Sequence, residues 1–167
     1  MAQYIIVSDI HGRADRLAQV ILRHPDAKGL IFLGDGAKDI LSVLCQNPAL
    51  PLYAVCGNCD DLRESEAETA FVAERLLVLE GHRIFMTHGH LYGVKHSLDD
   101  LLITGEAHRA DMILYGHTHQ PYDAYDSAQI GGRLMAVFNP GSLGDTRAYY
   151  GMLTIHGESI MASHVQL

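Results

Sequence analysis

The chain lacks the features of a nucleic-acid-binding, secreted or membrane-spanning protein. Its 167 residues include 12 Lys and Arg against 20 Asp and Glu, a net charge of −8, and the basic residues form no cluster. Binding along a nucleic-acid backbone depends on many phosphate contacts from basic side chains, so we expect no long polynucleotide as a partner. No run of about 18 apolar residues could cross a membrane, and no basic segment followed by an apolar stretch marks a signal peptide. We therefore expect a cytoplasmic protein without membrane contact.

Cysteine is also scarce. Cys45, Cys56 and Cys59 are odd in number and irregularly spaced, so they predict no disulfide framework and fit a reducing compartment. Cys56 and Cys59 match a CxxC redox pattern, but that chemistry needs a helix N-terminus to lower a thiol pKa. The residues from Asp60 onward are typical of a loop, so we favour a core position for Cys56.

Five short polar motifs each follow an apolar run with the length and β-branched composition of a buried strand. In open α/β sheets, ligands gather at the loops beyond the carboxyl ends of the strands, so these distant motifs are expected to converge. Convergence of so many carboxylate and imidazole groups predicts a metal centre. The motifs are Ser8-Asp9-Ile10-His11-Gly12, Gly34-Asp35-Gly36, Gly57-Asn58-Cys59-Asp60, Thr87-His88-Gly89-His90 and Gly116-His117-Thr118-His119.

The spacing inside two of the motifs suits metal ligation. Asp9 and His11 are two residues apart, and in an extended segment such side chains leave on the same face, so both can reach one ion. His117 and His119 share this spacing, which would let each imidazole bind a different ion of a close pair.

The other motifs offer one ligand each. Asp35 stands between two glycines, where a carboxylate can bridge two cations while the backbone comes close. Asn58 supplies a neutral oxygen and His88 a nitrogen. Such mixed oxygen and nitrogen ligands with open positions suit Mn²⁺, Fe²⁺, Ni²⁺ or Zn²⁺ better than Ca²⁺ or Mg²⁺, and we favour Mn²⁺.

The five motifs, in this order, resemble those of the calcineurin-like metallophosphoesterase superfamily, whose members hydrolyse phosphate esters with two metal ions. The short chain and the GNCD motif are similar to its small bacterial and archaeal phosphodiesterase branch, which is related to the metallophosphoesterase-fold subunit of the retromer coat. The resemblance covers Tyr4 to about Ser142. It implies one ion held by Asp9, His11, Asp35 and His119, and another held by Asp35, Asn58, His88 and His117.

The resemblance implies a metal-dependent phosphodiesterase acting on a small phosphate ester. Two divalent ions roughly 3.5 Å apart would attract a phosphate, and a water bridging them would attack phosphorus in line. A protein-interaction scaffold is the alternative, because the retromer subunit uses this fold to bind proteins, but all seven ligand positions are filled here. A phosphomonoesterase is a third reading, which the scarcity of Arg and His donors for a dianion disfavours.

Two further residues are candidates for catalysis. His90 follows His88 by two residues, which directs it to the same side, near the substrate phosphate. Asp60 either caps a backbone N–H in a turn or orients a metal-bound imidazole. Many superfamily members carry a His where this chain has Cys59, and use it to protonate the leaving oxygen; here that acid is His90, Cys59 or no side chain. The loop that ends at Ser142 also lies near the site in the family.

The pattern of apolar residues predicts one domain over residues 1–167, an α/β fold in which two facing sheets are covered by helices in a four-layer α/β/β/α sandwich. Exposed strands in such small domains often pair, so a homodimer is a further expectation. Six other histidines have no partner pattern and are expected on the surface: His24, His82, His96, His108, His156 and His164. Helices are expected over residues 13–23, 38–46 and 97–107, and strands over 4–7, 30–33, 52–55, 76–79, 82–88, 112–115, 122–124, 134–138, 151–155 and 159–165.

Overall fold

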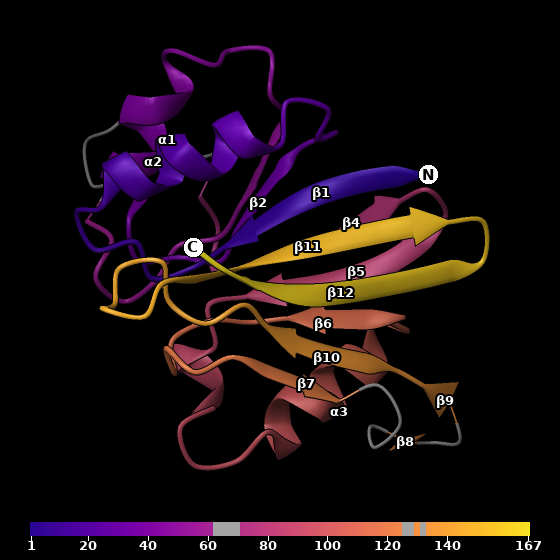
Figure 1. The fold of residues 1–167 in the computed structure, drawn as a ribbon. Helices are drawn as coiled ribbons and strands as arrows, with labels where there is room; N and C mark the ends of the chain where they lie inside the picture. Colours follow the sequence, from indigo (N-terminus) through magenta and orange to yellow (C-terminus); the bar gives the residue numbers. More distant parts are fainter. Residues whose placement is uncertain (62–70, 125–128, 131–132) are drawn as a thin grey trace.

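The computed structural model describes residues 1–61, 71–124, 129–130 and 133–167, and its strands form two five-stranded sheets (Figure 1). In the first sheet, β1 lies in the centre, parallel to β2 on one side and antiparallel to β11 on the other. β3 continues the parallel half and β12 the antiparallel half. The strands, in the order β12-β11-β1-β2-β3, are Ser159–Gln166, Tyr149–His156, Ala2–Val7, Leu30–Phe32 and Leu52–Ala54.

The second sheet has a parallel centre of β5, β6 and β10, with antiparallel edges β4 and β7. In the order β4-β5-β6-β10-β7 its strands are Glu74–Leu79, His82–Thr87, Met112–Leu114, Ala136–Asn139 and Tyr122–Ala124. A separate small hairpin pairs β8 (Gln129–Ile130) with β9 (Arg133–Leu134).

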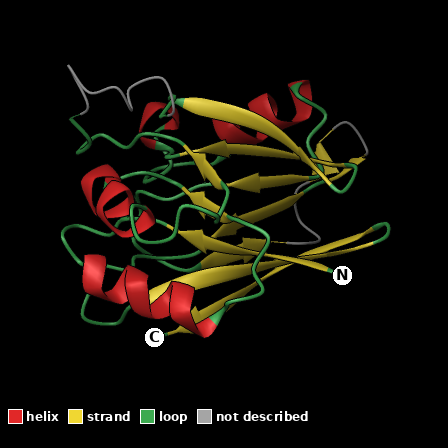
Figure 2. Ribbon diagram, turned by 90° about the horizontal axis from the view of Figure 1, so that it is seen from above, coloured by secondary structure: helices red, strands yellow, loops and turns green. Residues whose placement is uncertain are grey.

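Helices cover the outer faces of both sheets, as the two views show (Figures 1 and 2). α1 (Ala14–Arg23) and α2 (Ala37–Leu44) pack on the first sheet, and α3 (Asp99–Ala107) packs on the second. A third apolar cluster fills the space between the sheets. The four-layer sandwich predicted from the sequence is therefore confirmed. None of the helices among the described residues is long and apolar enough to cross a membrane.

The observed elements depart from the expected ones in one place that has a physical cause. The sequence predicts a single alternating strand over residues 134–138, but Leu134 belongs to the β8–β9 hairpin and β10 begins at Ala136. All four residues of β10 are buried, because the inter-sheet core covers Ala136 and Phe138 while the α3 layer covers Val137. A strand buried on both faces does not alternate. Gly131 and Gly132, the expected turn, lie outside the described residues.

A close contact between the two sheets gives a stability test. A Cβ placed on Gly151 in β11 would lie 2.6 Å from Cε1 of Phe138 and 3.2 Å from Cβ of Ile6. We expect Gly151→Ala to lower the free energy of unfolding by about 1–3 kcal/mol, because the methyl group overpacks this contact. Urea unfolding would measure the change. The matched control is Ser163→Ala on β12, where the side chain is exposed; an equal loss in both variants would contradict the packing argument.

Candidate metal centre

The predicted ligands all stand just beyond the ends of strands. Asp9 and His11 follow β1, Asp35 follows β2, and the loops after β3, β5 and β6 carry the rest. Because β1, β2 and β3 are parallel to one another, as are β5 and β6, each sheet presents its ligands at a single rim. The distances between these side chains show that the two rims meet.

The backbone at these positions is held in an unusual conformation. Five of the seven non-glycine residues with positive φ in the described part of the chain are predicted ligands. This left-handed region costs a side-chain-bearing residue roughly 1–3 kcal/mol, and it persists only where the surroundings determine it. Concentration of such residues at one place therefore marks a functional site. The residues and their φ angles are Asp9 (53°), His11 (46°), Asp35 (61°), His117 (67°) and His119 (63°).

Two motif glycines are needed because loops approach each other closely. A Cβ on Gly57 would lie 2.0 Å from Oδ1 of Asp35, and a Cβ on Gly116 would lie 1.9 Å from Oγ of Ser8. Any side chain at either position would push the loops apart. The glycines of the motifs thus allow ligands from different strands to come within reach of a common ion.

The first group of ligand atoms consists of acceptors that face one another. Nε2 of His119 lies 3.2 Å from Oδ1 of Asp9 and 3.3 Å from Nε2 of His11. Nδ1 of His119 contacts the Asp145 carboxylate at 3.1 Å and must donate to it, so Nε2 of the neutral ring carries a lone pair. Oδ1 of Asp9 is buried and has no hydrogen-bond partner, because Ser8 Oγ and the His117 amide both donate to Oδ2.

The second group repeats this arrangement. Nδ1 of His88 donates to the carbonyl of Leu33 at 2.7 Å, so Nε2 of the neutral ring is an acceptor. This buried Nε2 has no hydrogen bond and faces Oδ2 of Asp35 at 3.4 Å. Oδ2 of Asp35 also lies 3.9 Å from Nε2 of His11, so it stands between the two groups. That position fits the expected bridging carboxylate.

The remaining ligands differ in how they are placed. The ring centroid of His117 lies 5.0 Å from that of His88, which brings His117 into the second group. Asn58 is exposed, and its side-chain amide donates to Sγ of Cys59 at 3.2 Å. The structure thus places Asn58 beside the cluster through Cys59, whose own Sγ lies among the possible ligand atoms of His11 and Asp35.

The electrostatics favour a positive charge between these groups. Burial raises the pKa of Asp9. Burial also opposes ionisation of Asp35, but the neighbouring His88 and the Cys59 amide together outweigh it and lower the pKa of Asp35. Burial opposes the charged form of His88, yet Asp35 and Asp9 raise its pKa. Burial and the neighbouring His88 lower the pKa of His117 to about 4, so its ring is neutral at pH 7 and free to ligate a metal. Buried acceptors without donors, together with this charge balance, fit divalent cations.

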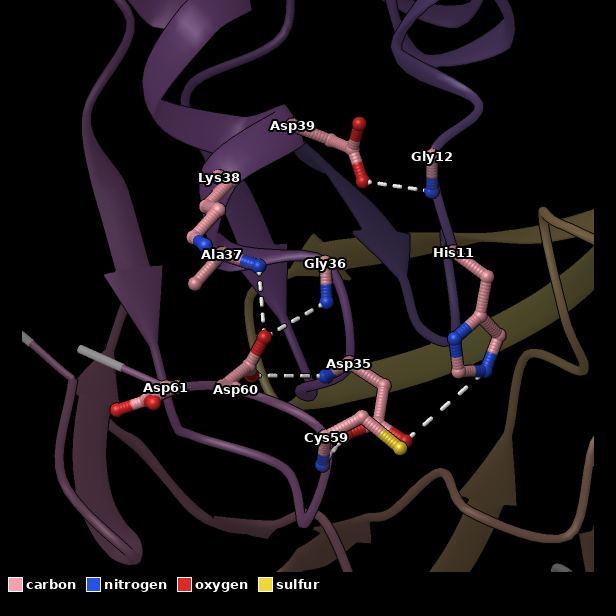
Figure 3. Close-up of a pocket in the computed structure, with 10 residues that line it drawn as sticks. All are labelled: His11, Gly12, Asp35, Gly36, Ala37, Lys38, Asp39, Cys59, Asp60 and Asp61. Carbon is pink, nitrogen blue, oxygen red and sulfur yellow. Dashed lines mark hydrogen bonds and ion pairs between the residues drawn. The ribbon is translucent and has the colours of Figure 1, made fainter.

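Asp60 binds backbone amides rather than an imidazole. One carboxylate oxygen accepts the amides of Gly36 and Ala37, each at 2.8 Å, and the other accepts that of Asp35 at 2.9 Å (Figure 3). The second oxygen also accepts the amide of Gly57 at 2.8 Å. These bonds link the β2 loop, the start of α2 and the β3 loop. Of the two roles expected for Asp60, the structure shows the capping of backbone amides. We therefore infer that Asp60 positions Asp35 and does not contact the substrate.

His90 lies beside two of the predicted ligands, His88 and His117. Its ring centroid is 5.4 Å from that of His88 and 6.1 Å from that of His117, and its buried Nδ1 has no hydrogen-bond partner. Burial lowers the pKa of His90. For Cys59, burial and Asp35 raise the thiol pKa in the metal-free protein, so the thiol keeps its proton at neutral pH. Its side chain is exposed, and no helix begins between Cys56 and Asp61.

Sequence reasoning missed the residues that orient the ligands. Asp145 holds the tautomer of His119, and Ser8 donates to Asp9 at 2.6 Å. Ser8 directly precedes a ligand, which is a usable signal, but Asp145 stands in a loop far along the chain with no pattern to mark it. Ser142 is buried and donates to the backbone carbonyl of Asp9 at 2.9 Å, so it fixes that loop instead of facing the ions.

The prediction that the other histidines lie on the surface is wrong for several of them. His24 bonds the Tyr150 hydroxyl at 2.9 Å, and His164 donates to the carbonyl of Asn139 at 2.8 Å. His82 and His108 are half-buried as well: a ring nitrogen of His82 contacts the carbonyl of Gly157, and the ring of His108 stacks on that of Phe85. None of these histidines belongs to the candidate metal groups found among the described residues.

Comparison with known proteins shows the family of this chain. The profile of the calcineurin-like phosphoesterase superfamily domain matches residues 3–158. The chain belongs to this superfamily. It is 33% identical over 161 residues to the probable metallophosphoesterase YsnB of Bacillus subtilis, covering 93% of this chain and 85% of that protein. It is 29% identical over 191 residues to the phosphodiesterase YfcE of Escherichia coli, covering 99% of this chain and 95% of that protein.

Solved structures of this superfamily share the fold. A predicted phosphoesterase from Streptococcus pneumoniae superposes with a TM-score of 0.78 at 22% identity, covering 99% of this chain and 89% of that one. An archaeal phosphodiesterase gives a TM-score of 0.74 at 20% identity, and Vps29 of Entamoeba histolytica, solved with Zn²⁺, gives 0.71 at 17%. These cover 99% and 98% of both chains, respectively. The chain therefore has the metallophosphoesterase fold over its whole length.

The contacts of Asp60 give a test of ligand positioning. In Asp60→Asn, the new NH₂ group would face two backbone N–H donors, so two hydrogen bonds to a charged acceptor are lost. We expect the free energy of unfolding to fall by about 1–3 kcal/mol and metal affinity to fall roughly tenfold. Thermal unfolding and calorimetric Mn²⁺ titration measure the two effects. The control is Asp26→Asn, an exposed carboxylate; wild-type metal affinity in Asp60→Asn would contradict the positioning role.

Proposed function

We propose that this protein is a dinuclear metal-dependent phosphodiesterase that hydrolyses a small phosphate ester. The observation that carries the proposal is the pair of facing acceptor groups, with Oδ1 of Asp9 and Nε2 of His88 buried without hydrogen bonds. Two divalent ions held there would supply Lewis acidity and a water of lowered pKa for attack on phosphorus. Membership of the superfamily and the phosphodiesterase name of a relative over the full chain support this reading.

We infer a division of the ligands into two sets that share Asp35. Asp9, His11 and His119 would hold one ion with Asp35, and their ring nitrogens and carboxylate oxygens lie within 3.2 to 3.9 Å of one another. The second set adds Asn58, His88 and His117 to Asp35. Mn²⁺ is the metal we propose, because imidazole, carboxylate and amide ligands together suit it.

The roles of the surrounding residues follow from their contacts. Asp145, hydrogen-bonded to Nδ1 of His119, turns Nε2 toward the ions, and Leu33 does the same for His88 through its carbonyl. Ser8 leaves a single oxygen of Asp9 free for coordination. His90, with an unpartnered buried Nδ1 beside these rings, is placed to hydrogen-bond a phosphate oxygen or the leaving group.

The bridging role of Asp35 can be tested by Asp35→Asn. An amide is neutral and a weaker bridging ligand than a carboxylate. We therefore expect the variant to lose one or both of the two ions, and its rate to fall about 10²-fold or more. Elemental analysis of the purified protein, with activity assayed in the same sample, measures both. Wild-type metal content together with a near-normal rate would contradict the bridging assignment.

The choice between diesterase and monoesterase can be tested with matched substrates. A diester carries one negative charge and needs fewer cationic donors than a dianionic monoester, and few Arg or Lys side chains approach the centre. We expect a higher kcat/KM for bis(4-nitrophenyl) phosphate than for 4-nitrophenyl phosphate when Mn²⁺ is supplied. The reverse preference would indicate a phosphatase, and no turnover with any of Mn²⁺, Ni²⁺, Fe²⁺ or Zn²⁺ would favour the scaffold.

The general acid can be identified from the dependence of rate on the leaving group. A well-placed acid contributes about 10²- to 10⁴-fold for poor leaving groups. We expect His90→Ala to slow aryl diesters increasingly as the pKa of the leaving phenol rises, and Cys59→Ala to have a small and uniform effect. A large, leaving-group-dependent loss in Cys59→Ala alone, with metal content intact, would instead assign the acid to Cys59, whose thiol keeps its proton in the metal-free protein.

A further inference from the structure

A cavity of about 680 Å³ opens beside the loops that carry His88 and His117. One wall is the segment 94–98 that follows the 3₁₀ turn His90–Tyr92, and the other is the segment 118–122 that leads into β7. Its volume lies in the range of sites that hold small organic ligands. It is separate from the pocket of Figure 3, which is lined by the β1, β2 and β3 loops.

Both walls of this cavity are continuous with the metal centre. Val94 packs on the loop that carries His88, since a Cβ on Gly89 would lie 2.9 Å from Cγ2 of Val94. Thr118 lines the cavity and stands between His117 and His119 in the chain, and its hydroxyl accepts the Asn139 amide at 3.0 Å. A phosphorus atom at the ions would thus leave its organic substituent at the mouth of this cavity.

The lining is aromatic and apolar at the floor. Tyr115 is buried, with 3% of its surface exposed, and Tyr122 is 40% exposed, and their ring centroids lie 6.4 Å apart in an edge-to-face arrangement. Leu98 and Leu102 complete the apolar wall, both half-buried. A cavity lined by aromatic and apolar side chains suits a flat ring, which can stack on or pack against them.

The charge around the metal centre is uneven. The described residues that line this cavity include Lys95 and His96 and no Asp or Glu, and Lys95 acts electrostatically on His117. By contrast, four carboxylates line the pocket of Figure 3, against one cation, Lys38. A negatively charged group that extends beyond the ions is therefore favoured on the side of Lys95, whereas Asp39 and Asp61 disfavour it on the side of the β1–β3 loops. The four carboxylates are Asp35, Asp39, Asp60 and Asp61.

We propose that the cavity between segments 94–98 and 118–122 is the subsite for the organic group of the substrate, and that this group is an aromatic or heteroaromatic ring bearing a second negative charge. The ring packs on Tyr122 over Tyr115, and the charge lies at Lys95. The inference rests on the proposed function for the position of the phosphate, and it names the substrate class that the proposed function leaves open.

The test measures binding of inert phosphonates to the Mn²⁺-loaded protein by calorimetry. Methylphosphonate and phenylphosphonate share the head group, but only the second reaches the cavity. We expect phenylphosphonate to bind about tenfold more tightly, from the apolar area that the ring buries. 4-Carboxyphenylphosphonate should gain about a further threefold through Lys95, the usual scale of an exposed ion pair.

Variants assign these preferences to residues. Tyr122→Ala should abolish the phenyl preference without changing methylphosphonate binding or metal content, and Tyr122→Phe should keep it. Lys95→Ala should remove only the gain from the ring carboxylate. Lys28→Ala, an exposed lysine beside Gln3 at the opposite end of β1 from Asp9, is the matched control and should change none of the three affinities.

The outcomes separate this inference from the proposed function. Equal affinity for methyl- and phenylphosphonate, or a phenyl preference that survives in Tyr122→Ala, would overturn the subsite while leaving the metal centre intact. A gain from the ring carboxylate that survives in Lys95→Ala would overturn the assignment of the second charge. Binding of none of the phosphonates to the Mn²⁺-loaded protein would count against the proposed function itself.

Discussion

The structure depends on one electrostatic constraint: several hydrogen-bond acceptor atoms face one another, and too few donor hydrogens lie between them. Oδ1 of Asp9 and Nε2 of His88 are buried without hydrogen bonds, and Nε2 of His119 faces both Asp9 and His11. Such an arrangement is unfavourable without a cation, because buried polar groups normally have hydrogen-bond partners. Ser8 donates to Asp9, and the Asp145 carboxylate and the Leu33 carbonyl accept from the Nδ1 atoms of His119 and His88; these partners turn each free acceptor inward and deepen that cost. The contacts around the site therefore favour a positive charge between these acceptor atoms.

The backbone conformation of the site also has an energetic cost, which is present without any ion. Five ligand residues adopt left-handed φ angles, and the loops are fixed by contacts that reach between strands, of which the four amides bound by Asp60 form the densest set. Strain of this kind is retained where packing over-determines the chain. The geometry of the candidate centre is therefore built into the scaffold.

The sequence predicted what depends on local pattern. Apolar runs followed by Asp, His and Asn gave the strand ends, and the four-layer sandwich followed from the order of elements. It could not reveal Asp145, because the contact with His119 joins residues 26 positions apart through loops whose path depends on tertiary packing. It misjudged His24 and His164, whose partners Tyr150 and Asn139 come from other strands. The sequence pattern also joined Leu134 to β10. Burial of β10 on both faces removes the alternation of apolar and polar residues that would mark where this strand begins.

The place of β1 has a consequence for how the protein is made. Its antiparallel partner β11 lies about 150 residues later in the chain, pairing Ala2 with Ile155 and Ile6 with Gly151. During synthesis, the segment carrying Asp9, His11 and Asp35 leaves the ribosome long before the strand that closes its sheet, and before His88 and His119 exist. Non-local pairing of this kind is slow to form. A nascent chain therefore holds only a fragment of the candidate metal centre until the C-terminal strands are made.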